Sequence, residues 1–134
     1  MNDIVTHIRN HNYMTGVSRS RERVKNTGEF FTPTPIVLEM LKSIPKDDIK
    51  NPDKVFYDPA CGDCQFLAEL VILRLKAGLS LEQILKTTFG TDLMDDNILI
   101  CHDRLLAGFE ELRYIVEKNI VCQDFFDYIK PKLF

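Results

Sequence analysis

Apolar side chains recur along this chain in two patterns, one typical of helices and the other of buried strands. Helical spacing of apolar residues predicts a helix that begins near Thr34, with Pro35 in its first turn, and ends before Pro45. A short helix is also predicted over residues 3–14. The polar segments between and after these helices, residues 16–29 and 45–53, are predicted to be irregular.

Further along the chain, three short apolar runs are predicted to be strands, and helical patterns separate them. The strands are predicted at residues 54–58, 87–92 and 119–124. A strongly apolar helix over residues 64–78 has Gly78 at its C-terminal cap, and a shorter helix begins where Ser80 and Gln83 are spaced as a capping box. One long helix is predicted over residues 95–118, with an apolar stripe formed by Ile98, Cys101, Leu105, Phe109 and Leu112.

Strands that alternate with helices favour a parallel sheet with right-handed crossovers. The chain has 134 residues, of which 45% are hydrophobic, so it is long enough for one domain with a real core and too short for two. We therefore predict a single α/β domain over residues 28–134. Residues 1–27 are predicted to form a basic N-terminal arm or helix.

Charge is distributed unevenly around the net value of −3. The first 28 residues carry five Lys or Arg side chains and only two Asp or Glu side chains, so the rest of the chain is acidic. A basic arm can contact the phosphates of DNA. A solvated leader without a nucleic-acid partner is the alternative, and composition does not decide between them.

Membrane insertion and secretion are not expected. No apolar run approaches the roughly 18 residues that a membrane span needs, and the N-terminus lacks the apolar stretch of a secretory signal. We therefore expect a cytoplasmic protein without a membrane partner.

Four cysteines give one C-x-x-C pair and two single residues: Cys61, Cys64, Cys101 and Cys122. This is half of a zinc pattern, because no second close pair follows. Reduced cysteines in a cytoplasmic chain are commonly buried as small apolar residues. On that interpretation we assign no metal.

The segment "DPACGDCQFL", residues 58–67, lies at the turn between the first predicted strand and its helix, where parallel sheets bind small ligands. Ala60 and Gly62 keep the turn free of bulky side chains, and glycine can adopt backbone angles closed to other residues. Asp58 is an acid at a place where a phosphate-binding loop would have none. We therefore expect a ligand that carries a positive charge.

The ends of the other two predicted strands complete this picture. Asp92 ends the second strand, where a carboxylate can accept hydrogen bonds from a ribose diol. Asp124 and Phe125 follow the third strand and could bond and stack an adenine. An amine or sulfonium, a ribose and an adenine together describe S-adenosylmethionine.

Four segments, taken in order, resemble consecutive motifs of the N6-adenine DNA methyltransferases of restriction-modification systems and phages: "GEFFTPTPIVLEML", "DPACGDCQFL", "GTDLMDDNILICHDRLL" and "NIVCQDFFDY". The resemblance covers residues 18–134. It implies a Rossmann-like sheet that binds S-adenosylmethionine, and methyl transfer to the amino group of a flipped adenine.

Carried over by position, the resemblance assigns ten cofactor-binding residues. The methionine end of the cofactor would be lined by Phe31, Thr32 and Pro33, and the turn after the first strand would be formed by Asp58, Ala60 and Gly62. The ribose and adenine would contact Asp92 and Leu93, and the edge and face of the adenine would contact Asp124 and Phe125.

Two departures from the family stand out. Cys64 occupies a position where the family usually has glycine, so its side chain is expected either to crowd the methionine moiety or to require a different turn. The family's catalytic motif, Asn or Asp followed by Pro-Pro and an aromatic residue, is absent, because Asn51-Pro52 is followed by Asp53. We therefore assign no catalytic residue.

The sequence ends about where the family's fourth strand begins, so an incomplete sheet of about three strands with an exposed edge is expected. A second copy of the chain, or a separate chain with the missing catalytic and target-recognition parts, would cover that edge. The predicted function is the cofactor-binding portion of a DNA adenine-N6 methyltransferase. The alternative is a stand-alone module that binds S-adenosylmethionine or a nucleoside, as a homodimer or an accessory subunit.

Overall fold

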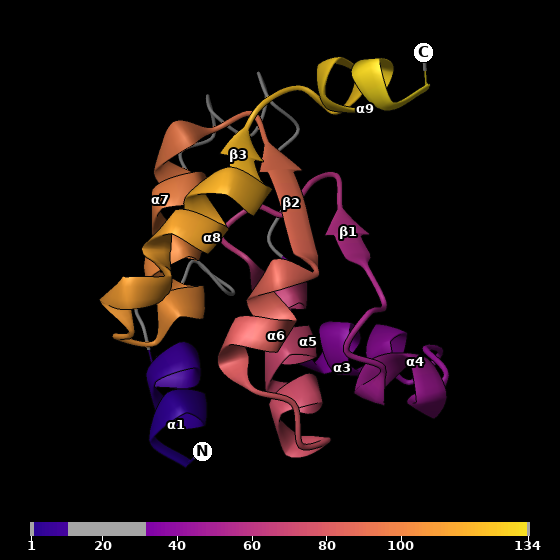
Figure 1. Ribbon diagram of the computed structural model, residues 1–134, viewed down its shortest axis with the longest axis vertical. Coiled ribbons are helices and arrows are strands. Elements are labelled where there is room, and N and C mark those ends of the chain that lie inside the picture. Colours follow the sequence, from indigo (N-terminus) through magenta and orange to yellow (C-terminus); the bar gives the residue numbers. More distant parts are fainter. Residues whose placement is uncertain (1, 11–31, 134) are drawn as a thin grey trace.

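A three-stranded parallel sheet organises the molecule in this computed structural model, which describes residues 2–10 and 32–133. Figure 1 shows the strands side by side in the order β1-β2-β3, with their carboxyl ends pointing the same way. The strands are β1 (Phe56–Asp58), β2 (Thr88–Asp92) and β3 (Ile120–Cys122). The α/β class and the three predicted strands are confirmed.

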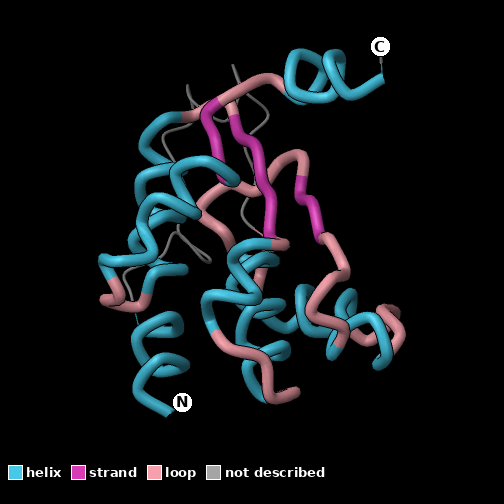
Figure 2. The backbone as a smooth tube through the Cα atoms, viewed as in Figure 1, coloured by secondary structure: helices cyan, strands magenta, loops and turns pink. Residues whose placement is uncertain are grey.

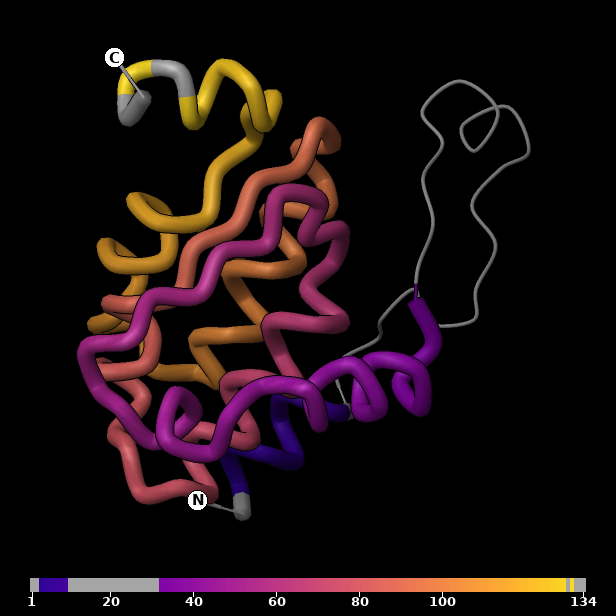
Figure 3. Tube along the Cα trace, turned by 90° about the vertical axis from the view of Figure 1, so that its right-hand side faces the viewer, coloured from indigo at the N-terminus to yellow at the C-terminus, as the bar shows by residue number. Residues whose placement is uncertain are grey.

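Helices cover both faces of the sheet. Figure 3 shows α5 on one side of the sheet and α8 on the other. The helices that connect β1 to β2 and β2 to β3 are α5 (Gln65–Lys76), α6 (Leu81–Lys86), α7 (Asp95–Leu106) and α8 (Arg113–Asn119), the last preceded by the short 3-10 helix η1 (Glu110–Leu112). Helix α5 is the centre of the core, with Leu67, Ala68 and Leu70 fully buried.

The remaining helices lie around this unit. Helices α3 (Thr34–Leu41) and α4 (Lys46–Lys50) precede β1 and contact α5. Helix α1 (Asn2–Asn10) contacts α5 and α7. Helix α9 (Phe125–Leu133) lies beyond the carboxyl ends of the strands, at the opposite end of the molecule from α1 (Figure 1). Among the described residues, no helix is both long enough and apolar enough to cross a membrane.

The caps predicted at the C-terminus of α5 and at the N-terminus of α6 are both present. The Ser80 hydroxyl accepts a bond from the Gln83 backbone N–H at 3.2 Å, and the Gln83 side chain accepts one from the Ser80 N–H at 2.9 Å. Both bonds of the capping box are therefore present. Gly78 has φ +100° just after α5, which is the left-handed conformation expected of a glycine at a helix end.

The predicted long helix over residues 95–118 is wrong. Figure 2 shows a break in the helical backbone between α7 and α8. Ala107 and Gly108 both have positive φ, 49° and 87°, and two successive left-handed residues end a helix. Phe109, placed on the apolar stripe, is 41% exposed in the turn that follows.

Two other predictions need correction near β1. The segment 45–53, predicted to be irregular, contains the short helix α4, because Ile49 is buried there. The strand predicted to be buried begins at Phe56 and is only half-buried, while Val55 is 57% exposed. In the described part of the chain β1 has a strand neighbour on one side only, which explains its exposure.

The side chain of Arg74 in α5 is buried, and it contacts the segment that leads into β1. Its guanidinium donates to the carbonyls of Ile49 and Asn51, at 3.0 and 2.6 Å, and to the Thr87 hydroxyl at 2.9 Å. The same group lies over the Phe56 ring, 4.9 Å from its centroid. Arg74 thus ties α5 to the segments that precede β1 and β2.

Helix α1 is held to the domain by contacts that include Ile8 and Arg9. Ile8 is fully buried, and its carbonyl accepts a bond from Arg104 Nε at 3.1 Å. Arg9 forms an ion pair with the buried carboxylate of Glu69, with an N–O distance of 2.9 Å. One cation of the predicted basic arm is therefore paired within the protein, while residues 11–27 of that arm lie outside the described residues.

Candidate functional site

The turn after β1 meets the end of β2 at the carboxyl edge of the sheet. Asp58 ends β1, and its Oδ1 accepts a bond from the Ala60 N–H at 3.1 Å. Gly62 has φ +56° and donates its N–H to Asp92 Oδ1 at 3.3 Å. Four residues that the sequence predicted for one site, Asp58, Ala60, Gly62 and Asp92, are therefore neighbours.

Backbone and side-chain donors hold the Asp92 carboxylate at the end of β2. Its Oδ2 accepts bonds from the Met94 N–H and from Asn97 Nδ2, both at 3.1 Å. A carboxylate offers about four lone-pair sites, two on each oxygen; Oδ2 already accepts two bonds and Oδ1 one, so Oδ1 can still accept a bond from a ligand. Asn97, in the first turn of α7, was missed because its side chain reaches back over five residues.

A cavity of about 260 Å³ lies beside the turn. Four predicted residues line it: Thr32, Asp58, Ala60 and Gly62. The rest of the wall is partly polar and partly apolar, and it comes from α3, β1, the turn and the start of α5: Val37, Met40, Tyr57, Cys61, Asp63, Gln65 and Phe66. Such a wall suits a small ligand with a charged group and an aliphatic portion.

The electrostatics of the cavity favour a positive charge. Burial raises the pKa of Asp58, the negative charge of Asp92 raises it further, and the bond from the Ala60 N–H opposes both effects. A cation bound next to Asp58 would relieve the cost of keeping its carboxylate ionised. A phosphate at the same place would add to that cost.

The other predicted site residues do not line this cavity, and Asp92 is among them, although it contacts the turn through Gly62. Pro33 is the N-cap of α3, and the Leu93 side chain is 63% exposed. The Asp124 carboxylate accepts from the Phe126 N–H at 2.8 Å, at the start of α9. The Phe125 ring lies 6.2 Å from that of Tyr57. Phe31 lies outside the described residues.

Tyr57 is a feature of the site that the sequence interpretation missed. Its hydroxyl shares a 2.7 Å hydrogen bond with Thr91, and its ring stacks on Tyr128 of α9 at 5.1 Å between centroids. Thr91 in turn donates to the Pro59 carbonyl at 3.0 Å. The apolar pattern of residues 54–58 identified Tyr57 only as part of a strand.

Cys64 does not crowd the cavity. It is the N-cap of α5 with φ +75°, a left-handed conformation that favours glycine, which explains the family's usual residue at this position. Its side chain is fully buried and forms a disulfide with Cys101 of α7, with 5.2 Å between the Cα atoms. The expectation of reduced cysteines is therefore wrong for this pair, because the left-handed backbone directs Cys64 toward α7.

A larger hollow, of about 770 Å³, lies between α3, α4 and the second half of α5. It is lined mainly by aliphatic residues such as Leu41, Ile49 and Ile72. No strand end or glycine turn contributes to it, so the chemistry expected of the sheet edge belongs to the smaller cavity.

The fold and the site together define a class. A parallel sheet with flanking helices, an acid at the end of β1, a glycine turn and an acid at the end of β2 are features of a Rossmann-like methyltransferase fold, here in part. The family model for N-6 DNA methylase matches residues 12–106, more than half of the 134-residue chain. This chain belongs to the N-6 DNA methylase family. No curated protein and no solved structure was found to match it significantly.

Proposed function

We propose that the cavity at the carboxyl edge binds S-adenosylmethionine, and that this chain is the cofactor-binding portion of an adenine-specific DNA methyltransferase. The observation that carries this proposal is the 3.3 Å bond from Gly62 to Asp92 beside Asp58. That contact holds the end of β2 against the turn that lines the cavity. Membership of the N-6 DNA methylase family supports the choice of cofactor.

The charges suit the parts of the cofactor. The α-amino group is a cation, and Asp58 is the half-buried acid that would pair with it. The methionine chain would lie against Thr32 and Ala60, which line the cavity. The ribose hydroxyls would donate to Asp92, and the adenine would follow toward Leu93 at the surface.

When bound, the cofactor supplies an electrophilic methyl group on a sulfonium. The residues of this chain bind and orient it; they do not hold the acceptor. Methyl transfer to adenine needs groups that grip the amino hydrogens and a ring that stacks on the extruded base. The sequence of 134 residues contains no Asn or Asp followed by Pro-Pro and an aromatic residue. We infer that transfer requires a complementary chain or segment.

A second candidate is a stand-alone module that binds S-adenosylmethionine or a nucleoside as a homodimer. The exposed edge of β1 favours it, because Val55 is 57% exposed and no described strand pairs with that side of β1. The two candidates differ in whether a complementary chain restores methyl transfer. Both require the same cavity.

Calorimetry with S-adenosylmethionine and S-adenosylhomocysteine tests the proposed cofactor. Replacing Asp92 with Ala should weaken binding by about 1–3 kcal/mol, because a ribose hydroxyl loses a half-buried acceptor. Asp53→Ala is the matched control, since Asp53 is exposed before β1. Absence of binding by the parent chain at roughly millimolar ligand would contradict the proposal.

A further inference from the structure

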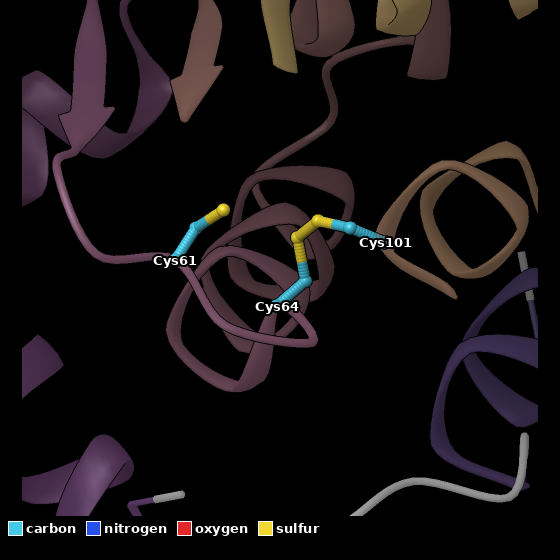
Figure 4. A group of neighbouring side chains, drawn as sticks. All are labelled: Cys61, Cys64 and Cys101. Atoms are coloured by element: carbon cyan, nitrogen blue, oxygen red, sulfur yellow. A yellow bond between two sulfur atoms is a disulfide. The ribbon is translucent and has the colours of Figure 1, made fainter. Parts of the chain in front are cut away.

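Three cysteine sulfurs converge between the turn and α7, outside the contacts assigned to the cofactor. Cys61, Cys64 and Cys101 are each buried, with exposures of 4%, 0% and 0%, and their sulfur atoms all lie within 4.8 Å of one another. Figure 4 shows the Cys61 sulfur directed toward the disulfide between the other two. The fourth cysteine, Cys122, is exposed on β3.

We propose that in the reduced chain these three cysteines bind one thiophilic d10 divalent cation, of which Zn²⁺ is the common biological example. The disulfide uses two of the sulfurs and leaves Cys61 as a thiol beside them. A metal ion uses all three. The disulfide and the metal site are therefore alternative states of one cluster.

Conversion between the states balances simply. A dithiol reductant gives two electrons and two protons to the Cys64–Cys101 bond and becomes a disulfide itself. The three thiols then lose three protons as three metal–sulfur bonds form. Thiolate bonds to Zn²⁺ are about 2.3 Å long, which places two sulfurs about 3.8 Å apart in a tetrahedral site. The Cys61 sulfur, within 4.8 Å of the other two, needs only a small movement to reach that spacing, whereas the sulfurs of Cys64 and Cys101 must separate once their bond is reduced.

Neighbouring charges favour a divalent cation here. Cys64 is the N-cap of the 12-residue helix α5, where the helix dipole stabilises a thiolate. The carboxylates of Asp58, Asp63 and Asp92 act electrostatically on Cys61. They oppose a lone thiolate but attract a cation, and two positive charges offset more of the three thiolates than one charge would.

Three thiolates leave one position of a tetrahedron. Among the described residues, no further His, Cys, Asp or Glu side chain joins the group. Cys61 lines the 260 Å³ cavity, so water can complete the coordination from that side. Zn²⁺ with three protein ligands and one water is an established arrangement.

Metal content after reduction tests the site without any assay of methyl transfer. The full chain is reduced with a water-soluble phosphine, incubated with Zn²⁺, passed through gel filtration and analysed by elemental mass spectrometry. One Zn²⁺ per chain is expected. In alkylation mapped by mass spectrometry, Zn²⁺ should protect Cys61, Cys64 and Cys101 and leave Cys122 reactive.

Variants separate this cluster from adventitious thiol binding. Cys61→Ser and Cys61→Ala should each lower Cd²⁺ affinity at least tenfold, measured from the thiolate-to-metal charge-transfer band, whereas Cys122→Ser should match the parent. Substoichiometric Zn²⁺ in the reduced parent would overturn the proposal, as would equal affinity in the Cys61 variants. A chain that keeps only two reactive thiols under excess phosphine would also overturn it, since two ligands would never become available.

Discussion

Asp58 shows how a single residue serves binding at the expense of stability. Its carboxylate ends β1, lines the cavity and accepts one bond, from the Ala60 N–H. Burial and the charge of Asp92 raise its pKa, so the empty site holds an anion in an unfavourable place. A ligand cation would remove that penalty, so we propose that Asp58 serves recognition of the ligand and not stability of the fold.

Replacing Asp58 with Asn should therefore stabilise the empty protein at neutral pH and weaken cofactor binding. Because the folded-state pKa lies above the unfolded value, protonation of Asp58 stabilises the fold, and this contribution is lost as pH rises through the folded pKa. The thermal midpoint of Asp58→Asn should exceed that of the parent above that pKa and converge with it at low pH. Thermal unfolding of the parent and of Asp58→Asn across this pH range measures the difference, with Asp53→Asn as control. If the midpoint of Asp58→Asn is lower than that of the parent at neutral pH, the charge is needed for folding.

At the scale of elements, the sequence predicted what local chemistry determines and missed what tertiary contacts determine. Capping at Ser80 and Gly78 was predicted because the bonds involved are made within a few residues. The break at Ala107 was missed because an alanine carries no local signal for a left-handed backbone. Helix α4 was missed because the burial of Ile49 depends on α5, which is distant in sequence.

The candidate site follows the same division. The resemblance to known motifs placed Asp58, Gly62 and Asp92 at one edge, since parallel strands bring successive carboxyl ends together. Asp124 was assigned to the adenine edge from the same resemblance, but the contact of its carboxylate with the Phe126 N–H at the start of α9 was not predicted, because it depends on the helix that follows β3. The stacking of Tyr57 on Tyr128 also depends on where α9 lies.

Arg74 provides the test at the scale of elements, because one side chain joins α5 to the segments before β1 and β2. Arg74→Met keeps much of the aliphatic length but leaves the Ile49 and Asn51 carbonyls without their donor. Hydrogen bonds from a charged donor are worth about 1.5–3 kcal/mol each, so a loss of about 3 kcal/mol or more is expected. Urea denaturation measures it, with the exposed Lys76→Met on the same helix as control. Equal urea midpoints for the two variants would show that Arg74 does not join α5 to the segments before β1 and β2.

At the scale of the whole molecule, the exposed side of β1 is the feature that most affects association with another chain. A strand edge presents backbone donors and acceptors that can pair with another chain. Phe56 donates its N–H toward β2, to the Thr87 carbonyl at 2.9 Å, and alternation along a strand turns the next residue, Tyr57, to the other side. We propose that a partner chain binds at this edge. We also propose that the basic segment 1–27 contacts DNA.

The isolated 134-residue chain is expected to exceed the mass of one protomer in solution and not to methylate DNA. Pairing of β1 with a second copy accounts for the first expectation, and the absence of the proline-proline motif for the second. Light scattering over a range of concentrations and transfer of labelled methyl groups to mixed DNA measure them. A monomer that methylates adenine would contradict both and would require another set of residues for the chemistry.

Nuclear magnetic resonance of the labelled 15.5 kDa chain during titration with S-adenosylhomocysteine tests the central claim most directly. The account predicts that the backbone amides of Ala60, Gly62 and Met94 shift, since they lie at the turn and at the Asp92 carboxylate. Amides around Leu41 and Ile49, which line the larger hollow, should not move. No shifts at saturating ligand, or shifts confined to that hollow, would contradict a cofactor site at the carboxyl edge of the sheet.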